Sequence, residues 1–376
     1  MTSSLTTGGA RPTAGSALVE DGGDAVDKRD VAILRAMEGL SRAFEWIPED
    51  KLLERLPMDY AELASRLEKL DRLGLIEYRY IDLYQTYAAR MKERAYDTLA
   101  LWDMKKHDVY ERLGTVIGEG KEATILNAKD PDDEFIVIKL HRYHAPEFRR
   151  IKKTLAYAAV KVRGEELQVE DHRLDVPRAK AQVEMRVLQV LNSKGFPVPE
   201  PRSINRHAVA MDMIEGNAPG IPAPLLAKVK VKNPEDALEV ILEDYKEMVL
   251  EGHYVHGDLS EHNILVTPDG ELYYVDWPQA VPVEHPSAPK LCYRDIRNVI
   301  QHFRRKYRID APDPKEVYNE IADDLQALME EKREEYEEHK EAAEKTLERL
   351  EESVERVEGD REREAGRREV EEDRVS

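Results

Sequence analysis

The chain of 376 residues contains a single cysteine, Cys292. One cysteine cannot form a disulfide within the chain, which is typical of proteins from a reducing compartment. The sequence also lacks an apolar run of about 18 residues, the length that a membrane-spanning helix needs, and its first residues carry no signal-peptide pattern. These absences predict a soluble, cytoplasmic protein.

Basic residues are the minority among the charged ones, with 57 Lys and Arg against 77 Asp and Glu, for a formal net charge of −20. This balance excludes a surface that binds nucleic acid generally, so any RNA contact must be local. Hydrophobic residues make up 41% of the chain and charged residues 36%. The sequence therefore supports a real core in two or three domains, with a sizeable part extended or solvated.

The first 27 residues are rich in Thr, Ser, Gly and Ala, show no periodicity and are predicted to be disordered. Helical and strand patterns then follow over residues 28–95. The expected elements are a helix from Val31 to Phe44, a short helix after Pro48, a helix from Asp59 to Gly74, and a strand over Leu75–Ile81 with a basic tip at Arg79. Three helices before a β-wing is the order of a winged helix domain.

The third of these helices carries Arg66, Lys69 and Arg72 on one side. In a winged helix this element can enter a nucleic-acid groove. Acidic residues are interleaved with the basic ones, however, so a solvated helix face explains the pattern equally well. Both interpretations stay open at this point.

A glycine-rich turn between two strand patterns is expected over residues 116–125, where Gly118 and Gly120 let the backbone approach phosphates. The apolar strand Phe135–Leu140 carries an inward-directed Lys139, and a buried lysine is costly without a charged partner. A nucleotide phosphate and a Glu on the next helix would supply that partner. Glu184 is the candidate, with an ordinary solvated helix position as the alternative.

The most informative stretch is 256–266, in which Asp258 is followed five residues later by Asn263. Turn residues then separate two short strands, Ile264–Val266 and Glu271–Val275, and predict a hairpin that returns Asp276 close to Asn263. Phosphoryl transfer needs an Asp that orients the attacking group, and an Asn and Asp that hold Mg²⁺. This block resembles protein-kinase-like phosphotransferases, and its His-Gly-Asp leaves protein and small-molecule acceptors open.

Three further segments complete the pattern. Residues 211–216 fall where a kinase has its hinge, and the backbone of Asp212 and Ile214 is expected to bind the adenine edge. Residues 141–176 form a basic insertion that could grip RNA or an acidic partner, or else a surface loop that balances nearby acids. Basic residues concentrated there are Arg142, Arg149, Arg150, Lys152, Lys153, Lys161 and Arg163. From about Asp313 a long charged helix or partial disorder is expected, with a coiled-coil helix as the sharper alternative.

Taken together, the motifs resemble the RIO kinases of the winged-helix branch (type two) in their archaeal form. The matching stretches are G-E-G-K-E at 118–122, H-G-D-L-S-x-x-N at 256–263, D-W-P-Q at 276–279, and R-D-I-x-N-V-I-x-x-F-R-R-K at 294–306. The resemblance covers about residues 28–310 and implies an α+β fold. The implied parts are a winged helix domain (28–95), a compact bilobal RIO domain (96–310, with N-lobe 110–211, hinge 211–216 and C-lobe 217–310), and a charged helical tail (311–376).

The resemblance also implies an ATP- and Mg²⁺-dependent serine/threonine kinase or ATPase that acts in maturation of the small ribosomal subunit. The phosphate would go to Ser or Thr, or transiently to an active-site Asp. Carried onto this sequence, the catalytic residues are Asp258 and Asp276, the metal ligands are Asn263 and Asp276, and the nucleotide-binding residues are Gly118, Gly120, Lys121, Glu122, Lys139, Glu184, Asp212 and Ile214. The implied partners are ATP and the pre-ribosomal small subunit, with RNA contacts through the winged helix and residues 141–176.

Two departures from the family pattern bear on the reaction. Ala123 stands where the family usually has Ser, which removes one phosphate contact. The family's autophosphorylated serine lies in the insertion, but residues 141–176 contain no serine and only one threonine, Thr154. An ATPase-type cycle therefore becomes more attractive. The alternatives are a small-molecule phosphotransferase of the aminoglycoside or choline kinase type, and a nucleotide-gated RNA-binding assembly module.

Overall fold

The computed structural model describes residues 25–163 and 174–375. The predicted disordered segment 1–27 lies outside the described residues except for its last three positions, and so does part of the insertion, residues 164–173. The N-terminal domain contains α2 (Lys28–Leu40), β1 (Ile47–Pro48), α3 (Glu49–Leu53), α4 (Tyr60–Arg72), β2 (Ile76–Ile81) and β3 (Thr86–Met91), with strand order β1-β3-β2. This is the expected order of three helices and a wing.

Two of the three basic residues of α4, Arg66 and Lys69, face inward rather than toward solvent. Arg66 donates to Asp27, at 2.9 Å, and to Asp30, at 2.7 Å, and Lys69 donates to Asp30 at 2.7 Å. Asp30 is fully buried, so these cations neutralise a carboxylate that would otherwise be costly to desolvate. The expectation of an outward basic face at Arg66 and Lys69 is therefore wrong.

Arg79 does not mark the tip of the wing either. Its guanidinium lies 4.3 Å from the centre of the Trp46 ring, a cation–π contact. The chain turns between β2 and β3 at residues 82–85. The wing tip instead exposes Leu83, which is the most exposed large hydrophobic residue described.

Helix α5 (Glu93–Lys106) joins the N-terminal domain to the rest of the chain through buried charges. Asp97 accepts two hydrogen bonds from Arg142, at 2.7 and 2.8 Å, and one from His207 at 2.8 Å. Paired carboxylate and guanidinium groups in this bidentate arrangement are strong and geometrically specific. The junction therefore fixes the N-terminal domain on the sheet that follows.

That sheet has five antiparallel strands in the order β4-β5-β6-β8-β7. Its strands are β4 (Arg112–Glu119), β5 (Ala123–Lys129), β6 (Phe135–His141), β7 (Pro201–Asn205) and β8 (Ala208–Asp212), and the long helices are α6 (Ala145–Arg163) and α7 (Asp175–Ser193). Lys139 lies on the central strand opposite Ile125 and Val209. The register thus places this lysine between two apolar neighbours in the middle of the sheet.

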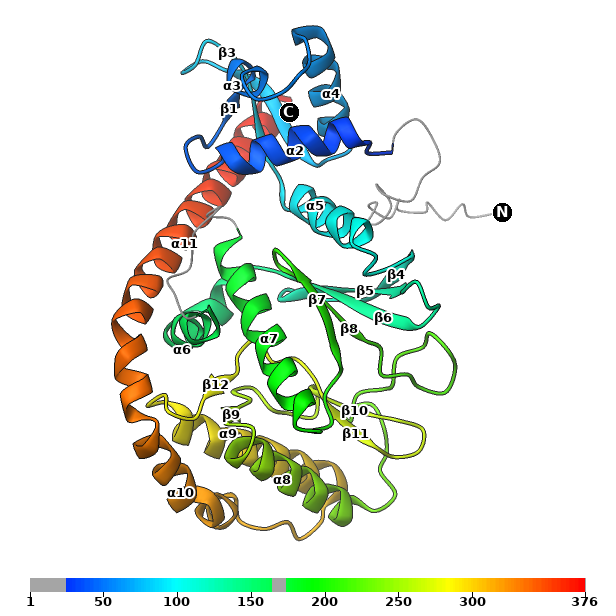
Figure 1. Cartoon of the computed structure of the whole chain (residues 1–376), viewed down its shortest axis with the longest axis vertical. Coiled ribbons are helices and arrows are strands. Elements are labelled where there is room, and N and C mark those ends of the chain that lie inside the picture. The colour runs from blue at the N-terminus through cyan, green and yellow to red at the C-terminus, as the bar shows by residue number, and fades with distance from the viewer. Residues whose placement is uncertain (1–24, 164–173, 376) are drawn as a thin grey trace.

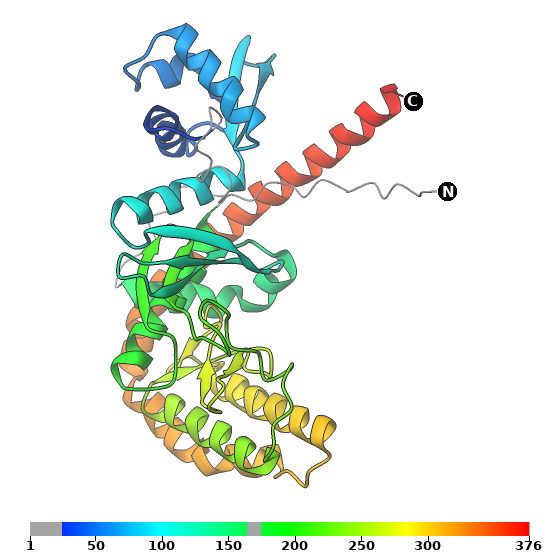
Figure 2. The same cartoon turned by 90° about the vertical axis from the view of Figure 1, so that its right-hand side faces the viewer.

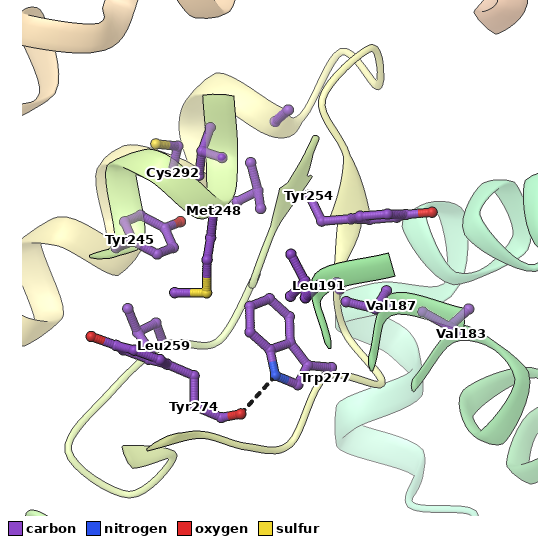
Figure 3. Close-up of a cluster of buried hydrophobic side chains, with 14 of the residues drawn as sticks. Val183, Val187, Leu191, Tyr245, Met248, Tyr254, Leu259, Tyr274, Trp277 and Cys292 are labelled. Atoms are coloured by element: carbon purple, nitrogen blue, oxygen red, sulfur yellow. Dashed lines mark hydrogen bonds between the residues drawn. The ribbon is translucent and has the colours of Figure 1, made fainter. Parts of the chain in front are cut away.

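The second lobe follows below this sheet in Figure 1. Its elements are α8 (Pro234–Leu250), β9 (Tyr254–Val255), β10 (Ile264–Val266), β11 (Leu272–Tyr274), β12 (Val281–Pro282) and α9 (Ala288–Tyr307). Strands β10 and β11 form the expected hairpin, with Ile264 paired to Tyr274. Figure 3 shows Trp277 at the centre of the core, where its indole Nε1–H donates to the Tyr274 carbonyl at 3.0 Å.

The charged tail forms two helices, α10 (Pro314–Glu331) and α11 (Arg333–Val375). Helix α10 packs on α8 and α9, and α11 then runs along α6 and α7 (Figure 1), with a C-terminal end that projects away from the N-terminal domain (Figure 2). The tail therefore contacts both lobes on the outside of the molecule.

Within residues 25–163 and 174–375, no helix is long and apolar enough to cross a membrane.

Candidate active site

A cleft of about 810 Å³ lies between the two lobes. Among the described residues, its lining includes every residue that was predicted to bind nucleotide or metal. The predicted catalytic residue Asp258 is not part of the lining. The predicted residues that line it are Gly118, Gly120, Lys121, Glu122, Lys139, Glu184, Asp212, Ile214, Asn263 and Asp276. Residues from the glycine-rich turn, two strands, a helix and the hairpin thus converge on one volume.

Lys139 is the centre of the charged part of the cleft. Its Nζ lies 2.6 Å from Glu184 Oε1 and 2.7 Å from Asp276 Oδ1. Burial alone would lower the pKa of Lys139, but the charges of Asp276 and Glu184 outweigh it and raise that pKa above its ordinary value. Lys139 therefore stays an ammonium ion and bridges the two lobes.

Glu184 is only 1% exposed, so the alternative of a solvated helix position does not hold. Its second oxygen lies 2.7 Å from His141 Nε2, and the Trp277 backbone N–H donates to its first oxygen at 3.2 Å. Burial would raise the pKa of Glu184, but Lys139 and His141 lower it. His141 was not predicted as a site residue, although it lies two residues after Lys139 and so faces the same side of the strand.

Asp276 ends the hairpin in a left-handed backbone conformation, with φ of 70°. The neighbouring Trp277 is fully buried, and its ring lies 4.4 Å from the ring of His256. Desolvation would raise the pKa of Asp276, yet the Lys139 ammonium lowers it below its usual range. The packed tryptophan thus anchors a strained residue whose carboxylate is kept charged.

Asn263 and Asp276 offer the kind of ligands that Mg²⁺ prefers, an amide oxygen and a carboxylate. The Asn263 side-chain Nδ2–H₂ donates to the Asp258 carbonyl at 2.9 Å, so its oxygen is the atom that can hold a cation. The Val275 N–H donates to the Asn263 carbonyl at 3.0 Å, which fixes the two chain segments together. This donor set fits the predicted cation.

Asp258 lies on the loop before the hairpin and is held by different groups. Gln279 Nε2 donates to its Oδ2 at 3.2 Å, and Arg150 Nη2 lies 3.8 Å from its Oδ1. Burial raises the pKa of Asp258, which Arg150 opposes only in part. Neither Gln279 nor Arg150 was predicted as a site residue. Gln279 was noted only as the last residue of the D-W-P-Q motif, and Arg150 comes from the insertion, far from Asp258 in sequence.

The loop backbone around Asp258 is fixed by one buried carboxylate. Asp295 accepts from the Gly257 N–H at 2.7 Å and from the Leu259 N–H at 3.2 Å. Burial raises the pKa of Asp295 to about 7. Gly257 has φ of 76°, and a Cβ there would lie 2.4 Å from the Gln279 carbonyl oxygen. This crowding explains why the motif reads His-Gly-Asp, since no side chain fits at its second position.

A second charged group lies at the phosphate-facing end of the predicted site. Lys180 Nζ is 2.7 Å from Glu147 Oε2, and both are buried. Burial raises the pKa of Glu147 to about 6, although Lys180 opposes this. Lys180 also lines the cleft. It is a second cation near the glycine-rich turn. It was not predicted as a site residue, because nothing in the sequence of the start of α7 indicates a role in the cleft.

At the hinge, the two predicted residues differ in what they can offer. The Asp212 N–H donates to the Glu200 carbonyl at 2.9 Å, and its carboxylate pairs with Arg202. The N–H and the carboxylate of Asp212 are therefore engaged within the protein, and its expected backbone contact with the adenine edge stays a prediction. The Ile214 carbonyl accepts from the Ala223 N–H at 2.8 Å, which ties the hinge to the segment that follows it.

Comparison with known proteins gives a consistent result. A family model described as the RIO domain matches residues 124–317, and one described as the Rio2 N-terminal domain matches residues 24–107. The RIO-type serine/threonine-protein kinase Rio2 of Methanocaldococcus jannaschii is 33% identical over 282 residues, which cover 73% of this chain and 95% of the relative. The serine/threonine-protein kinase rio2 of Schizosaccharomyces pombe is 28% identical over 279 residues, covering 74% and 76%.

The fold also matches a solved structure. The crystal structure of the Rio2 kinase–ADP/Mg²⁺–phosphoaspartate complex from Chaetomium thermophilum superposes with a TM-score of 0.64 at 23% identity, and the match covers 88% of this chain and 96% of that one. The similarity extends over the N-terminal domain and both lobes, so it concerns the whole arrangement rather than one motif.

Proposed function

The chain belongs to the RIO family of atypical serine/threonine kinases, in its Rio2 branch, and on this premise we propose that it binds Mg²⁺–ATP in the cleft and transfers the γ-phosphate transiently to Asp276. Rio2 of Chaetomium thermophilum has been described as an ADP/Mg²⁺–phosphoaspartate complex. The observation that carries the proposal is the Lys139 ammonium, which lies 2.7 Å from the Asp276 carboxylate and keeps it charged. A nucleophilic carboxylate must be ionised.

The residues of the cleft have separate roles in the proposed reaction. The Asp276 oxygen attacks the γ-phosphorus, the bond between that phosphorus and the bridging oxygen breaks, and ADP leaves. Lys139 and Lys180 offset negative charge on the phosphates and on the developing leaving group. Mg²⁺ held by Asn263 and Asp276 would neutralise further phosphate charge. Asp258, whose pKa is raised, accepts a proton from the water that then hydrolyses the acyl phosphate.

We also assign the protein to the maturation of the small ribosomal subunit, with the pre-ribosomal particle as its partner and the cytoplasm as its location. The support is the Rio2 branch itself and the N-terminal domain that this branch carries. Because Arg66 and Lys69 of α4 are paired internally, the basic helix α6 becomes the main candidate for the local RNA contact. Arg72, which is exposed, remains available on α4.

The proposed reaction is tested by the chemistry of the label. Pure protein is incubated with γ-labelled ATP and Mg²⁺, beside Asp276→Asn and Asp258→Ala. We expect a label that hydroxylamine removes and that Asp276→Asn abolishes. An acid-stable label on Ser or Thr that Asp258→Ala abolishes would instead indicate a protein kinase without the aspartyl intermediate. A screen of small acceptors with the same ATP tests the alternative of a small-molecule phosphotransferase, and absence of any turnover would favour a binding module.

A further inference from the structure

The acidic tail helix covers the basic insertion helix along much of its length. Lys152 Nζ lies 2.5 Å from Glu351, Arg149 Nη2 lies 3.6 Å from Glu358, and Lys161 Nζ lies 3.0 Å from Glu335. Figure 1 shows α11 passing beside α6 after it leaves α10. Helix α6 carries six basic residues and one acidic residue, and in this structure three of those cations meet carboxylates of α11.

The contact also has an apolar part. The buried positions of α11 recur at helical spacing and are Ala343, Thr346, Leu350 and Ser353, and the hydrophobic residues Leu347, Val354 and Val357 are partly buried against the core that contains Leu350. From α6, the Tyr157 ring lies 5.1 Å from that of Tyr336. The contact therefore combines an apolar stripe with a row of ion pairs, and the ion pairs are the part that a competing charge can affect.

Two of the three ion pairs remain open to solvent. The Lys152 and Glu351 side chains are 36% and 39% exposed, and Arg149 is 72% exposed although Glu358 lies beside it. Lys161 is 16% exposed and also meets the buried Glu284. Exposed ion pairs contribute little and are weakened by salt. The pairs at Lys152 and Arg149 are therefore ones that a competing polyanion can replace.

We propose that α11 occupies the surface with which α6 binds RNA, and that the RNA phosphate backbone and α11 compete for it. From Glu335 to Glu358 the helix rises by about 34 Å at 1.5 Å per residue, so its carboxylates form an extended row of negative charge. An extended row has the form of a nucleic-acid strand, rather than that of a compact acidic patch. Arg149 and Lys153, both exposed with α11 in place, offer the first contacts. The inference rests on the proposed RNA contact of the insertion.

The competition is tested in the full chain with two charge-matched variants. The first, E335Q/E351Q/E358Q, removes the three carboxylates that meet α6. The control, E341Q/E344Q/E348Q, removes three exposed carboxylates of the same helix, so both variants change the net charge equally. The probe is a fluorescent single-stranded RNA of about 20 nucleotides, and binding is followed by anisotropy at about 0.1 M salt.

We expect the first variant to bind this RNA roughly tenfold more tightly than the wild type, and the control to stay within about twofold. Adding R149Q and K152Q to the first variant should cancel the gain, because these cations form the proposed surface. In the wild type, saturating RNA should increase amide hydrogen exchange in residues 342–357 of α11.

Equal RNA affinity of the two triple variants would overturn the proposal, and so would unchanged exchange in α11 when RNA is bound. If polyglutamate rather than RNA gains affinity in the first variant, the occupant is an acidic polypeptide and the proposal of RNA fails. ATP turnover is measured on the same preparations. Turnover that persists while the RNA results fail would remove this inference alone, whereas lost turnover in the wild type would contradict the proposed function.

Discussion

Asp276 and Asp258 lie on two sides of the same active site. We call the surroundings of Asp276 the cleft side and the loop that carries Asp258 the loop side, and the two differ. Asp276 lines the cleft, with the Lys139 ammonium 2.7 Å away. Asp258 does not belong to the described cleft lining; it meets the Gln279 amide at 3.2 Å and the Arg150 guanidinium only at 3.8 Å. A close buried cation lowers the pKa of one carboxyl group, and burial raises the pKa of the other.

This difference assigns separate tasks to two chemically identical groups. A carboxylate with a lowered pKa stays charged, as a cation ligand or a nucleophile must. A carboxyl group with a raised pKa releases and takes up a proton closer to neutral pH, which suits proton transfer. Opposite pKa shifts within one site are therefore informative about mechanism, whereas the sequence presents both residues simply as aspartates.

The largest effect is expected on the cleft side. Asp276→Asn should lower ATP turnover by about a thousandfold or more, because it removes a cation ligand and the proposed nucleophile together. Asparagine adopts the left-handed backbone readily, so the fold should persist, and thermal unfolding provides that control. Phosphate release measures turnover. A loss of less than about tenfold would mean that the two aspartates do not differ as described.

On the loop side, Asp258→Asn should lower kcat by about a hundredfold while leaving the affinity for ATP nearly unchanged. The reason is that the carboxyl group lies outside the described cleft lining, and its proposed role is limited to proton transfer. Steady-state kinetics and equilibrium nucleotide binding separate the two quantities. Loss of ATP affinity in this variant would place Asp258 among the nucleotide-binding groups and remove the distinction.

Asp295 fixes the backbone of the loop that carries Asp258 through hydrogen bonds, and Asp295→Asn tests whether these bonds position Asp258. An amide has one acceptor oxygen for donors that come from Gly257, Leu259 and Tyr245. We expect kcat to fall by roughly tenfold to a hundredfold, because displaced catalytic groups react slowly. ATP affinity should change little. An unchanged kcat would show that these hydrogen bonds do not position Asp258.

The same variant gives a test through pH. The pKa of Asp295 is about 7 in the folded protein, against an ordinary value of 3.8. Between these values the folded state holds a proton that the unfolded state releases, so this group's contribution to stability is lost as pH rises toward 7. Urea unfolding at about pH 5 and pH 7.5 should show a decline in the wild type that is smaller in Asp295→Asn. Equal declines would refute the raised pKa.

The smallest effect concerns Arg150, the only cation of the insertion that contacts the loop side among the described residues. Arg150→Gln removes a charge that lowers the pKa of Asp258, so the acid limb of the pH profile of kcat/KM should move to higher pH. Its neighbour Arg149 contacts Glu358 instead. Arg149→Gln is thus the matched control and should leave the profile unmoved.

Local patterns predicted the cleft side well. The hairpin of β10 and β11 is a short-range structure whose turn residues and apolar strands are visible in the sequence, and it joins Asn263 to Val275 as expected. Lys139 was recognisable because a charged residue interrupted an apolar strand. The α+β fold and the family were predicted correctly for the same reason: they rest on contiguous motifs.

The loop side and the charged helices were harder to predict. Helical periodicity tells which residues share a face, but it does not tell which other element that face meets. Arg66 was assigned to solvent or RNA because its partner Asp30 comes from another helix. Arg150 and Glu351 likewise meet groups more than a hundred residues away. Such pairs depend on tertiary packing, for which a single sequence carries no local signal.

The comparison between the two aspartates is tested most directly by the effect of Mg²⁺ on ATP affinity. Calorimetric titration with and without Mg²⁺ compares the wild type with Asp276→Asn and Asp258→Asn. If Asp276 holds the cation and Asp258 does not, Mg²⁺ strengthens ATP binding in the wild type and in Asp258→Asn but not in Asp276→Asn. The same Mg²⁺ dependence in all three proteins, or its loss in Asp258→Asn alone, would contradict the account.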